Sequence, residues 1–156
     1  MSQGLKWNID AAAATVRLEG VFDEHARVEQ IAQEIPMPRV TFDLAGIRRM
    51  NSLGIRRWIQ LLGLLEGRHI LLKRCPPAVV DQLNAVKGFA GTAAVDSVLL
   101  PYTCDDCGTT TYHELHVARM KSLAQVPEAA ACSKCGGSAS FDDILERYLS
   151  FALLKA

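Results

Sequence analysis

The chain lacks several features that mark large classes of proteins. It has no excess of either charge, since 17 Lys and Arg residues balance 17 Asp and Glu residues among its 156. Its first ten residues lack the apolar core of a signal peptide, and no apolar run is long enough to span a bilayer. It also lacks a low-complexity tract. We therefore expect a globular, cytoplasmic protein with no membrane segment. The balanced charge does not call for nucleic acid as a partner, although it leaves a local basic face open.

Motifs of the common catalytic sites are missing as well. The sequence has no glycine-rich phosphate loop, no nucleophile elbow and no zinc motif with an open coordination position. Glu24 and His25, next to Asp23, resemble a catalytic pair, but their place at the start of a predicted helix favours a role in capping. We expect a protein that is not an enzyme.

Cysteines supply the strongest chemical signal. Four of the five fall into two Cys-x-x-Cys pairs, Cys104/Cys107 and Cys132/Cys135, and a glycine follows each pair. A gap of two residues lets both sulfurs of one turn point at a single ion, and four thiolates complete a tetrahedral zinc site. Two disulfides or a redox Cys-x-x-Cys pair are the alternatives. The spacing predicts a zinc ribbon with a structural zinc ion, and thiols kept for metal suit a reducing compartment.

Two histidines and the fifth cysteine lie outside these pairs. His113 and His116 stand between them, but four cysteines already complete the tetrahedron, and residues three apart in a strand point to opposite faces. We expect neither histidine to be a metal ligand. Cys75 precedes a proline, and we expect it to be a small buried residue at the end of a strand.

Hydrophobic periodicity in the first hundred residues alternates between that of strands and that of helices. The predicted strands cover residues 5–9, 15–18, 40–44, 69–73 and 97–102. The predicted helices cover residues 25–35 and 52–65, and a third starts at Pro76 or Pro77. Such alternation with short links is typical of an α/β layer with a mostly parallel or mixed sheet.

The predicted helix over residues 52–65 is amphipathic. Its apolar stripe consists of Ile55, Trp58, Ile59, Leu62 and Leu65.

The chain divides into three predicted segments. An α/β domain covers residues 1–100, the zinc ribbon covers residues 101–141, with a strand at residues 109–117, and a C-terminal helix covers residues 142–156. The apolar face of that helix suits packing against the α/β layer, which would make the ribbon an insertion rather than an appendage.

One loop of the α/β segment carries a family resemblance. Residues 50–54 (MNSLG) stand between a buried strand and the amphipathic helix, and residues 18–23 (LEGVFD) contain a Gly-x-x-Asp sequence. These motifs, with the strand at residues 69–73 and its proline-started helix, resemble the STAS domain (sulphate transporter and anti-sigma-factor antagonist). Members of that family carry Asp-Ser-x-Gly at the loop. The resemblance covers roughly residues 1–100 and implies a STAS-like mixed sheet with helices packed on it.

The resemblance gives Ser52 a function. In the bacterial regulators of the family, the serine after the aspartate is phosphorylated by a partner kinase that is also an anti-sigma factor. A serine at a helix N-terminus suits an anion, and the implied function is signalling by partner switching. Here Asn51 replaces the aspartate and Leu53 stands where many members have Ser or Thr. A phosphorylated switch, an unmodified docking loop that includes Gly54, and a simple helix cap all remain open.

Two arginine pairs flank this loop, Arg48-Arg49 before it and Arg56-Arg57 after it. They are either a cationic rim for an acidic partner or a phosphate, or solvated side chains on a polar face.

Two other functions remain open. A zinc-ribbon adapter for transcription or nucleic-acid machinery is one, although Asp105 and Asp106 in the first knuckle would repel phosphate. A structural protein that self-associates, as a homodimer for example, through the helix of Trp58 is the other.

Overall fold

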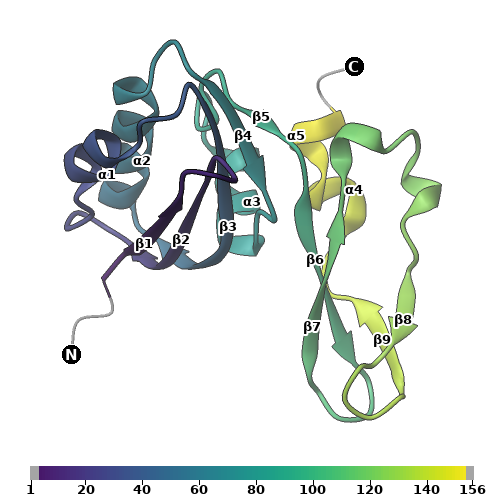
Figure 1. The fold of residues 1–156 in the computed structure, drawn as a ribbon. Helices are drawn as coiled ribbons and strands as arrows, with labels where there is room; N and C mark the ends of the chain where they lie inside the picture. Colours follow the sequence, from purple (N-terminus) through teal and green to yellow (C-terminus); the bar gives the residue numbers. More distant parts are fainter. Residues whose placement is uncertain (1–3, 154–156) are drawn as a thin grey trace.

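The computed structural model describes residues 4–153, which form two β-sheets with helices packed on them (Figure 1). The first sheet has the strand order β1-β2-β3-β4-β5. Its strands are β1 (Lys6–Asp10), β2 (Thr15–Phe22), β3 (Arg39–Met50), β4 (His69–Lys73) and β5 (Ala94–Val95). β1 pairs with β2 in antiparallel fashion and the other neighbours are parallel, so the predicted mixed α/β architecture is confirmed. The ends of the predicted segments, residues 1–3 and 154–156, lie outside the described residues.

Three helices accompany this sheet: α1 (Val28–Glu34), α2 (Ser52–Leu64) and α3 (Pro77–Ala85). α1 and α2 pack together, and Trp58 of α2 is the centre of the core at 1% exposure. Its ring meets Phe22 and Phe42 edge to face, with centroids 6.0 and 5.5 Å away, and stacks on Phe89 at 5.7 Å. The indole N–H donates to the carbonyl oxygen of Phe89 at 2.9 Å, so this large ring is buried with its polar atom satisfied.

The second sheet is antiparallel throughout, with the order β7-β6-β9-β8. Its strands are β6 (Val98–Cys104), β7 (Thr110–Leu115), β8 (Ala129–Ala131) and β9 (Ser138–Phe141). The short 3₁₀-helices η1 (Val117–Arg119) and η2 (Leu123–Gln125) lie between β7 and β8, and the helices α4 (Leu145–Tyr148) and α5 (Ser150–Leu153) follow β9. α3 contacts both β3 and β6, and it lies between the two sheets in Figure 1.

β6 corrects one expectation of the sequence analysis. Residues 97–102 were expected to end the α/β layer, but β6 pairs with β7 and β9 of the second sheet. In the described part of the chain, an isolated parallel bridge between Val98 and Cys75 joins β6 to the segment that follows β4 of the first sheet. The N–H of Leu99 donates there to the carbonyl oxygen of Cys75 at 2.8 Å. The fifth position of the first sheet belongs to the two-residue strand β5, which is too short to give a periodic signal.

Two of the predicted helices also differ from those in the structure, the first at its start and the last along its length. The helix predicted from residue 25 begins at Val28, because the Asp23 carboxylate accepts from the N–H of His25 at 2.9 Å and holds a turn there. The single helix predicted over residues 142–156 is split, within the described residues, into α4 and α5. The N–H of Phe151 donates to the side-chain oxygen of Asn84 in α3 at 2.8 Å, which replaces the helical bond that would continue α4. The C-terminal segment therefore packs back on α3.

A buried carboxylate lies where the two sheets meet. Asp43 of β3 is 1% exposed and accepts two hydrogen bonds from Arg74, at 3.1 and 2.7 Å, while Arg17 stands 3.6 Å away. Burial acts to raise the pKa of Asp43, but the bonds from Arg74 and the N–H of Ala45 outweigh it and lower that pKa below its usual value. The N–H of Arg74 donates to the buried hydroxyl of Ser97, so the ion pair ties β3 to the start of the second sheet.

Cys75 lies one residue further along. It is fully buried, and burial raises the pKa of its thiol to about 12. The sequence expectation of a small buried residue is confirmed, and the thiol is not a reactive one.

Within residues 4–153, no helix has both the length and the apolarity needed to cross a membrane; α2, for example, has 13 residues.

We predict that Asp43→Asn makes the free energy of unfolding less dependent on pH in the acidic range. The folded-state pKa of Asp43 is lowered, so the carboxylate stabilises the fold above its unfolded pKa of about 3.9 and loses this effect as pH falls through the folded value. At pH 7 the variant should lose about 1.5–3 kcal/mol, the range for a hydrogen bond to a charged group. Urea unfolding at pH 7, 5, 4 and 3 measures both effects. Asp81→Asn, at an exposed acid of α3, is the control, and parallel curves for wild type and Asp43→Asn would refute the prediction.

Candidate metal centre and docking loop

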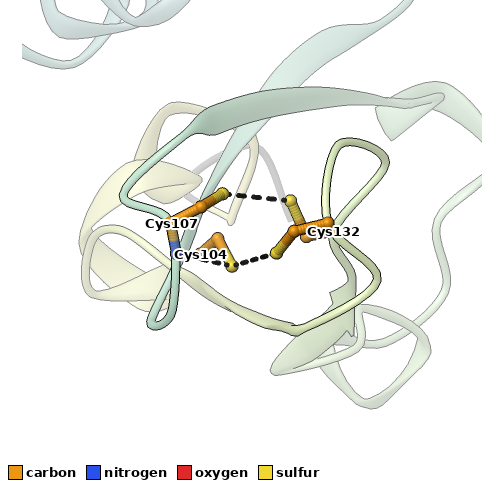
Figure 2. A group of neighbouring side chains, drawn as sticks. Cys104, Cys107 and Cys132 are labelled. Carbon is orange, nitrogen blue, oxygen red and sulfur yellow. Dashed lines mark hydrogen bonds between the residues drawn. The ribbon is translucent and has the colours of Figure 1, made fainter.

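The four paired cysteines come together at the tip of the second sheet. Cys104 ends β6 and Cys107 follows in the turn to β7, while Cys132 and Cys135 lie in the turn between β8 and β9. Their four Sγ atoms all lie within 4.8 Å of one another. Cys107 faces Cys132 across the cluster, with their Sγ atoms 3.7 Å apart (Figure 2). The Sγ atom of Cys104 is 3.5 Å from that of Cys135.

These distances fit a metal site better than disulfides. A tetrahedral ion with Zn–S bonds of about 2.3 Å places its sulfurs about 3.8 Å apart, whereas a disulfide has an S–S length of about 2.05 Å. All four residues are free cysteines, with Cys104 and Cys132 buried and Cys107 and Cys135 exposed. The cluster is therefore compatible with a zinc ion held by four thiolates. Such a closed set of ligands supplies folding energy and leaves no coordination position for a substrate.

Each knuckle, meaning the turn around one cysteine pair, presents a backbone N–H group to the first sulfur of that pair. The N–H of Asp106 lies 3.4 Å from the Sγ of Cys104, and the N–H of Lys134 lies 3.4 Å from the Sγ of Cys132. These donors stabilise negative charge on the sulfurs and orient them toward the centre.

The glycine after each pair closes its turn. The N–H groups of Gly108 and Gly136 donate to the carbonyl oxygens of Cys104 and Cys132, at 3.0 and 2.9 Å. Their φ angles of 74° and 76° lie in the left-handed region, which glycine adopts without steric cost. The sequence signal of a glycine after each pair therefore has a conformational cause.

The pKa values of the thiols in the cluster are shifted in opposite directions. Hydrogen bonds with Thr109 lower the pKa of Cys107 to about 6. The N–H of Gly137 acts to lower the pKa of Cys135, but the neighbouring sulfurs of Cys104 and Cys107 outweigh it and raise this pKa to about 12. Four crowded thiols cannot all ionise alone because their charges repel, whereas a divalent cation would replace their protons. The donor set thus matches what zinc requires.

Neither histidine between the pairs joins the cluster. Among the described residues, the metal-competent group around these turns consists of the four cysteines alone. The ring of His113 packs edge to face on Tyr102 with a centroid distance of 4.9 Å. His116 lies near the junction of the sheets, 3.7 Å from Asp96 and 3.9 Å from Glu114.

The second candidate site is the loop between β3 and α2. Asn51 caps α2, since its side-chain oxygen accepts from the N–H of Gly54 at 2.7 Å, and its amide donates to Glu24 at 2.9 Å. The bond from Asn51 lowers the pKa of Glu24. Ser52 is exposed at the first position of the helix, and no described residue bonds to its hydroxyl. The cap is therefore Asn51, and Ser52 is left open to solvent.

Gly54 is required by the packing of α2 on β2. A Cβ atom at this position would lie 1.8 Å from the carbonyl oxygen of Phe22, at the end of β2. Any side chain would push the N-terminus of α2 away from the sheet. The glycine of the loop motif is thus explained by close approach of two backbones.

The arginines around the loop are not equivalent. Arg57 is engaged, 3.3 Å from both Glu29 and Gln60. Arg48, Arg49 and Arg56 are exposed, and none of them makes an ion pair or side-chain hydrogen bond within the described part of the chain. Three of the four arginines are therefore available to a partner.

The outward face of α2 also carries apolar side chains, which the sequence analysis missed in part. Leu53 and Leu64 are both 48% exposed and Ile59 is 40% exposed. Ile59 was assigned to the buried stripe, but that place is taken by Leu61, which is fully buried. Because Leu61 and Ile59 lie on opposite sides of the same stripe, apolarity alone could not say which of them faces the sheet.

We predict that purified wild-type protein contains one zinc ion per chain and that Cys104→Ser loses it. Binding free energy in such modules is folding free energy, so the variant should lose protection from hydrogen exchange over residues 98–141. Elemental analysis and exchange measured by mass spectrometry test this. Cys75→Ala is the control, because it removes a buried cysteine that is not in the cluster. A metal-free wild type with the mass of two disulfides, or a metal-free variant that stays protected, would contradict the prediction.

We predict opposite effects of two glycine-to-alanine substitutions in α2. Gly54→Ala should destabilise the protein by about 3 kcal/mol, because its methyl group collides with the Phe22 carbonyl. Gly63→Ala should stabilise it by about 0.5–1 kcal/mol, because a Cβ there meets nothing within 4 Å and alanine favours the helix. Chemical denaturation measures both, and equal effects would show that close approach does not govern position 54.

No protein-family model matches the chain, and no curated protein matches it either. Any assignment of function therefore rests on the residues of the two sites described above.

Proposed function

We propose that the protein is a non-enzymatic docking module that resembles the STAS anti-sigma-factor antagonists and works by partner switching through the β3–α2 loop and the outward face of α2. The observation that carries the proposal is the composition of this surface. It combines an exposed Ser52, three free arginines and the exposed apolar side chains of Leu53, Ile59 and Leu64. Apolar anchors with a charged rim are typical of protein–protein interfaces.

The arrangement of the first sheet supports the same proposal. The loop joins the end of β3 to the start of α2, next to the end of β2 where the Gly-x-x-Asp sequence lies. The motifs on which the resemblance depends are therefore neighbours in space. Asn51 bonds to the helix and to Glu24, so it keeps the loop shaped without the charge of an aspartate.

A phosphate on Ser52 would change this surface by charge rather than by shape. The helix N-terminus and Arg56, one turn along the same face, would stabilise the added dianion. Glu24, already ionised beside Asn51, would add to the negative field. A partner attracted to free arginines would then meet a cancelled or reversed charge, which is how such a switch would release it.

In this proposal the second sheet has a structural role and zinc is its cofactor. Its knuckles expose Asp105 and Asp106 and only one basic residue, Lys134. That charge favours neither DNA nor RNA, so a nucleic-acid adapter has less support. Self-association through the helix of Trp58 would use the exposed apolar side chains of α2 rather than Trp58 itself, because that ring is buried. Exposed metal-binding thiols suit a reducing, cytoplasmic location.

We predict that Ser52→Asp weakens binding to the partner about tenfold, equivalent to about 1.4 kcal/mol, while Ser52→Ala leaves it unchanged. A pull-down from the native lysate identifies the partner, expected to be an anti-sigma factor or serine kinase, and calorimetry with the purified pair measures the affinity. The acidic residue at a helix N-terminus should not destabilise the fold, so lost binding cannot come from unfolding.

Thr92→Asp controls for added negative charge, since Thr92 is exposed in the loop before β5. Equal affinities of wild type, Ser52→Asp and Ser52→Ala would rule out control of binding by charge at Ser52. The loop would then serve only to start α2. Detection of phosphate on Ser52 by mass mapping of the protein from its native cells would demonstrate the modification itself.

A further inference from the structure

A hollow of about 330 Å³ lies between the two sheets, and of its lining residues Arg48 alone belongs to the surface proposed above. One wall is formed by Ala45 and Ile47 of β3, and the opposite wall by Leu99 of β6 and Tyr112 of β7. Residues 76–78, at the start of α3, complete it. These strands lie on either side of α3 in Figure 1. The volume is within the range of ligand sites, and a cavity of about 150 Å³ already admits a benzene ring.

The lining is apolar and stiff. Pro76 and Pro77 have fixed φ angles, and Ala45 and Ala78 have no rotamers to order. Tyr112 is 53% exposed, which leaves much of an aromatic ring without a packing partner in the chain. A preformed hollow of this kind binds an apolar group with little loss of side-chain entropy.

Charge at the edge of the hollow is positive. Arg48 lines it, Arg49 follows, and no described residue forms an ion pair or side-chain hydrogen bond with either of them. A guanidinium without a partner next to an apolar hollow is complementary to a carboxylate attached to an apolar group. Arg48 is also three residues before Asn51 in the chain, so the Cα atoms of these two residues lie no more than about 11 Å apart.

We propose that this hollow is the anchor site for an acidic segment of the protein partner, with an aromatic side chain between Ile47 and Tyr112 and an adjacent carboxylate on Arg48. The inference rests on the proposed docking function and extends it by naming the chemistry that the partner presents. The aromatic ring supplies the buried contact, and the carboxylate supplies selectivity for an acidic sequence.

The smallest probe that carries both groups is N-acetylphenylalaninate, and its neutral amide, N-acetylphenylalaninamide, is the matched ligand. In backbone NMR spectra of the zinc-loaded full chain, the carboxylate should cause saturable shifts at Ala45, Ile47, Arg48 and Ala78. The dissociation constant should be on the order of 1 mM, as expected for a ligand of this size. The amide should bind at least fivefold more weakly, because it cannot pair with the guanidinium.

Two pairs of variants make the test specific. Ala78→Leu fills the hollow and should abolish the shifts, while Ala85→Leu makes the same change at an exposed position of the same helix and should not. Arg48→Glu should remove the preference for the carboxylate, while Arg39→Glu, exposed at the start of the same strand, should preserve it. Unchanged spectra of the remaining residues show that each variant folds.

The outcomes separate this inference from the proposed function. No saturable shift at 10 mM probe, which is about ten times the expected dissociation constant, or shifts that persist in Ala78→Leu, would overturn the site. Equal binding of carboxylate and amide would overturn the role of Arg48. If the partner's affinity responds to Ser52→Asp while the probe fails to bind, docking stands without this anchor. Probe binding that the variants abolish as predicted, together with competition between probe and partner, supports both.

Discussion

Strand β6 links the edge of the first sheet to the thiol cluster at the tip of the second sheet. β6 begins at Val98, which bridges to Cys75 beside the first sheet, and ends at Cys104, one of the four clustered cysteines. Since a strand rises about 3.3 Å per residue, its seven residues hold the thiol cluster roughly 20 Å from the junction. Leu99, near the start of this strand, forms part of the wall of the hollow. The position of that wall therefore depends on pairing of the second sheet, which in turn depends on the closed cluster of thiols at its far end.

The junction is held by charge as well as by backbone pairing. Asp43 is buried within an apolar strand and would be costly there without Arg74, which reaches it from just after β4. Arg74 also has a φ angle of 53°, an uncommon conformation for a residue with a side chain, and its N–H bonds to Ser97. The chain thus turns sharply between β4 and α3 in order to place the guanidinium on Asp43. This ion pair serves the shape of the fold.

How much of this could be predicted differs between elements for physical reasons. β4 has the bounds expected from its short apolar run, and the four cysteines cluster as their spacing predicts, because both signals are local. The sheet to which β6 belongs could not be predicted, since pairing partners distant in the chain compete for the same backbone groups. The break between α4 and α5 depends on Asn84, more than sixty residues away. The lone acid in a buried strand was the available hint of an ion pair, but it did not identify Arg74.

The sequence by itself determined the mixed α/β architecture, the position of the thiol cluster and the start of α2 at Ser52. Each follows from the spacing of residues within a few turns or one strand. Only the tertiary structure decided which side chains on α2 remain exposed, which arginines stay unpaired and where the hollow between the sheets lies. These depend on how surfaces from separate segments meet: Gly54 against Phe22 sets the depth of α2, and Glu29 removes Arg57 from the free charges. A surface that can bind a partner consists of the side chains that such packing leaves exposed. Local periodicity in the sequence does not predict which side chains these are.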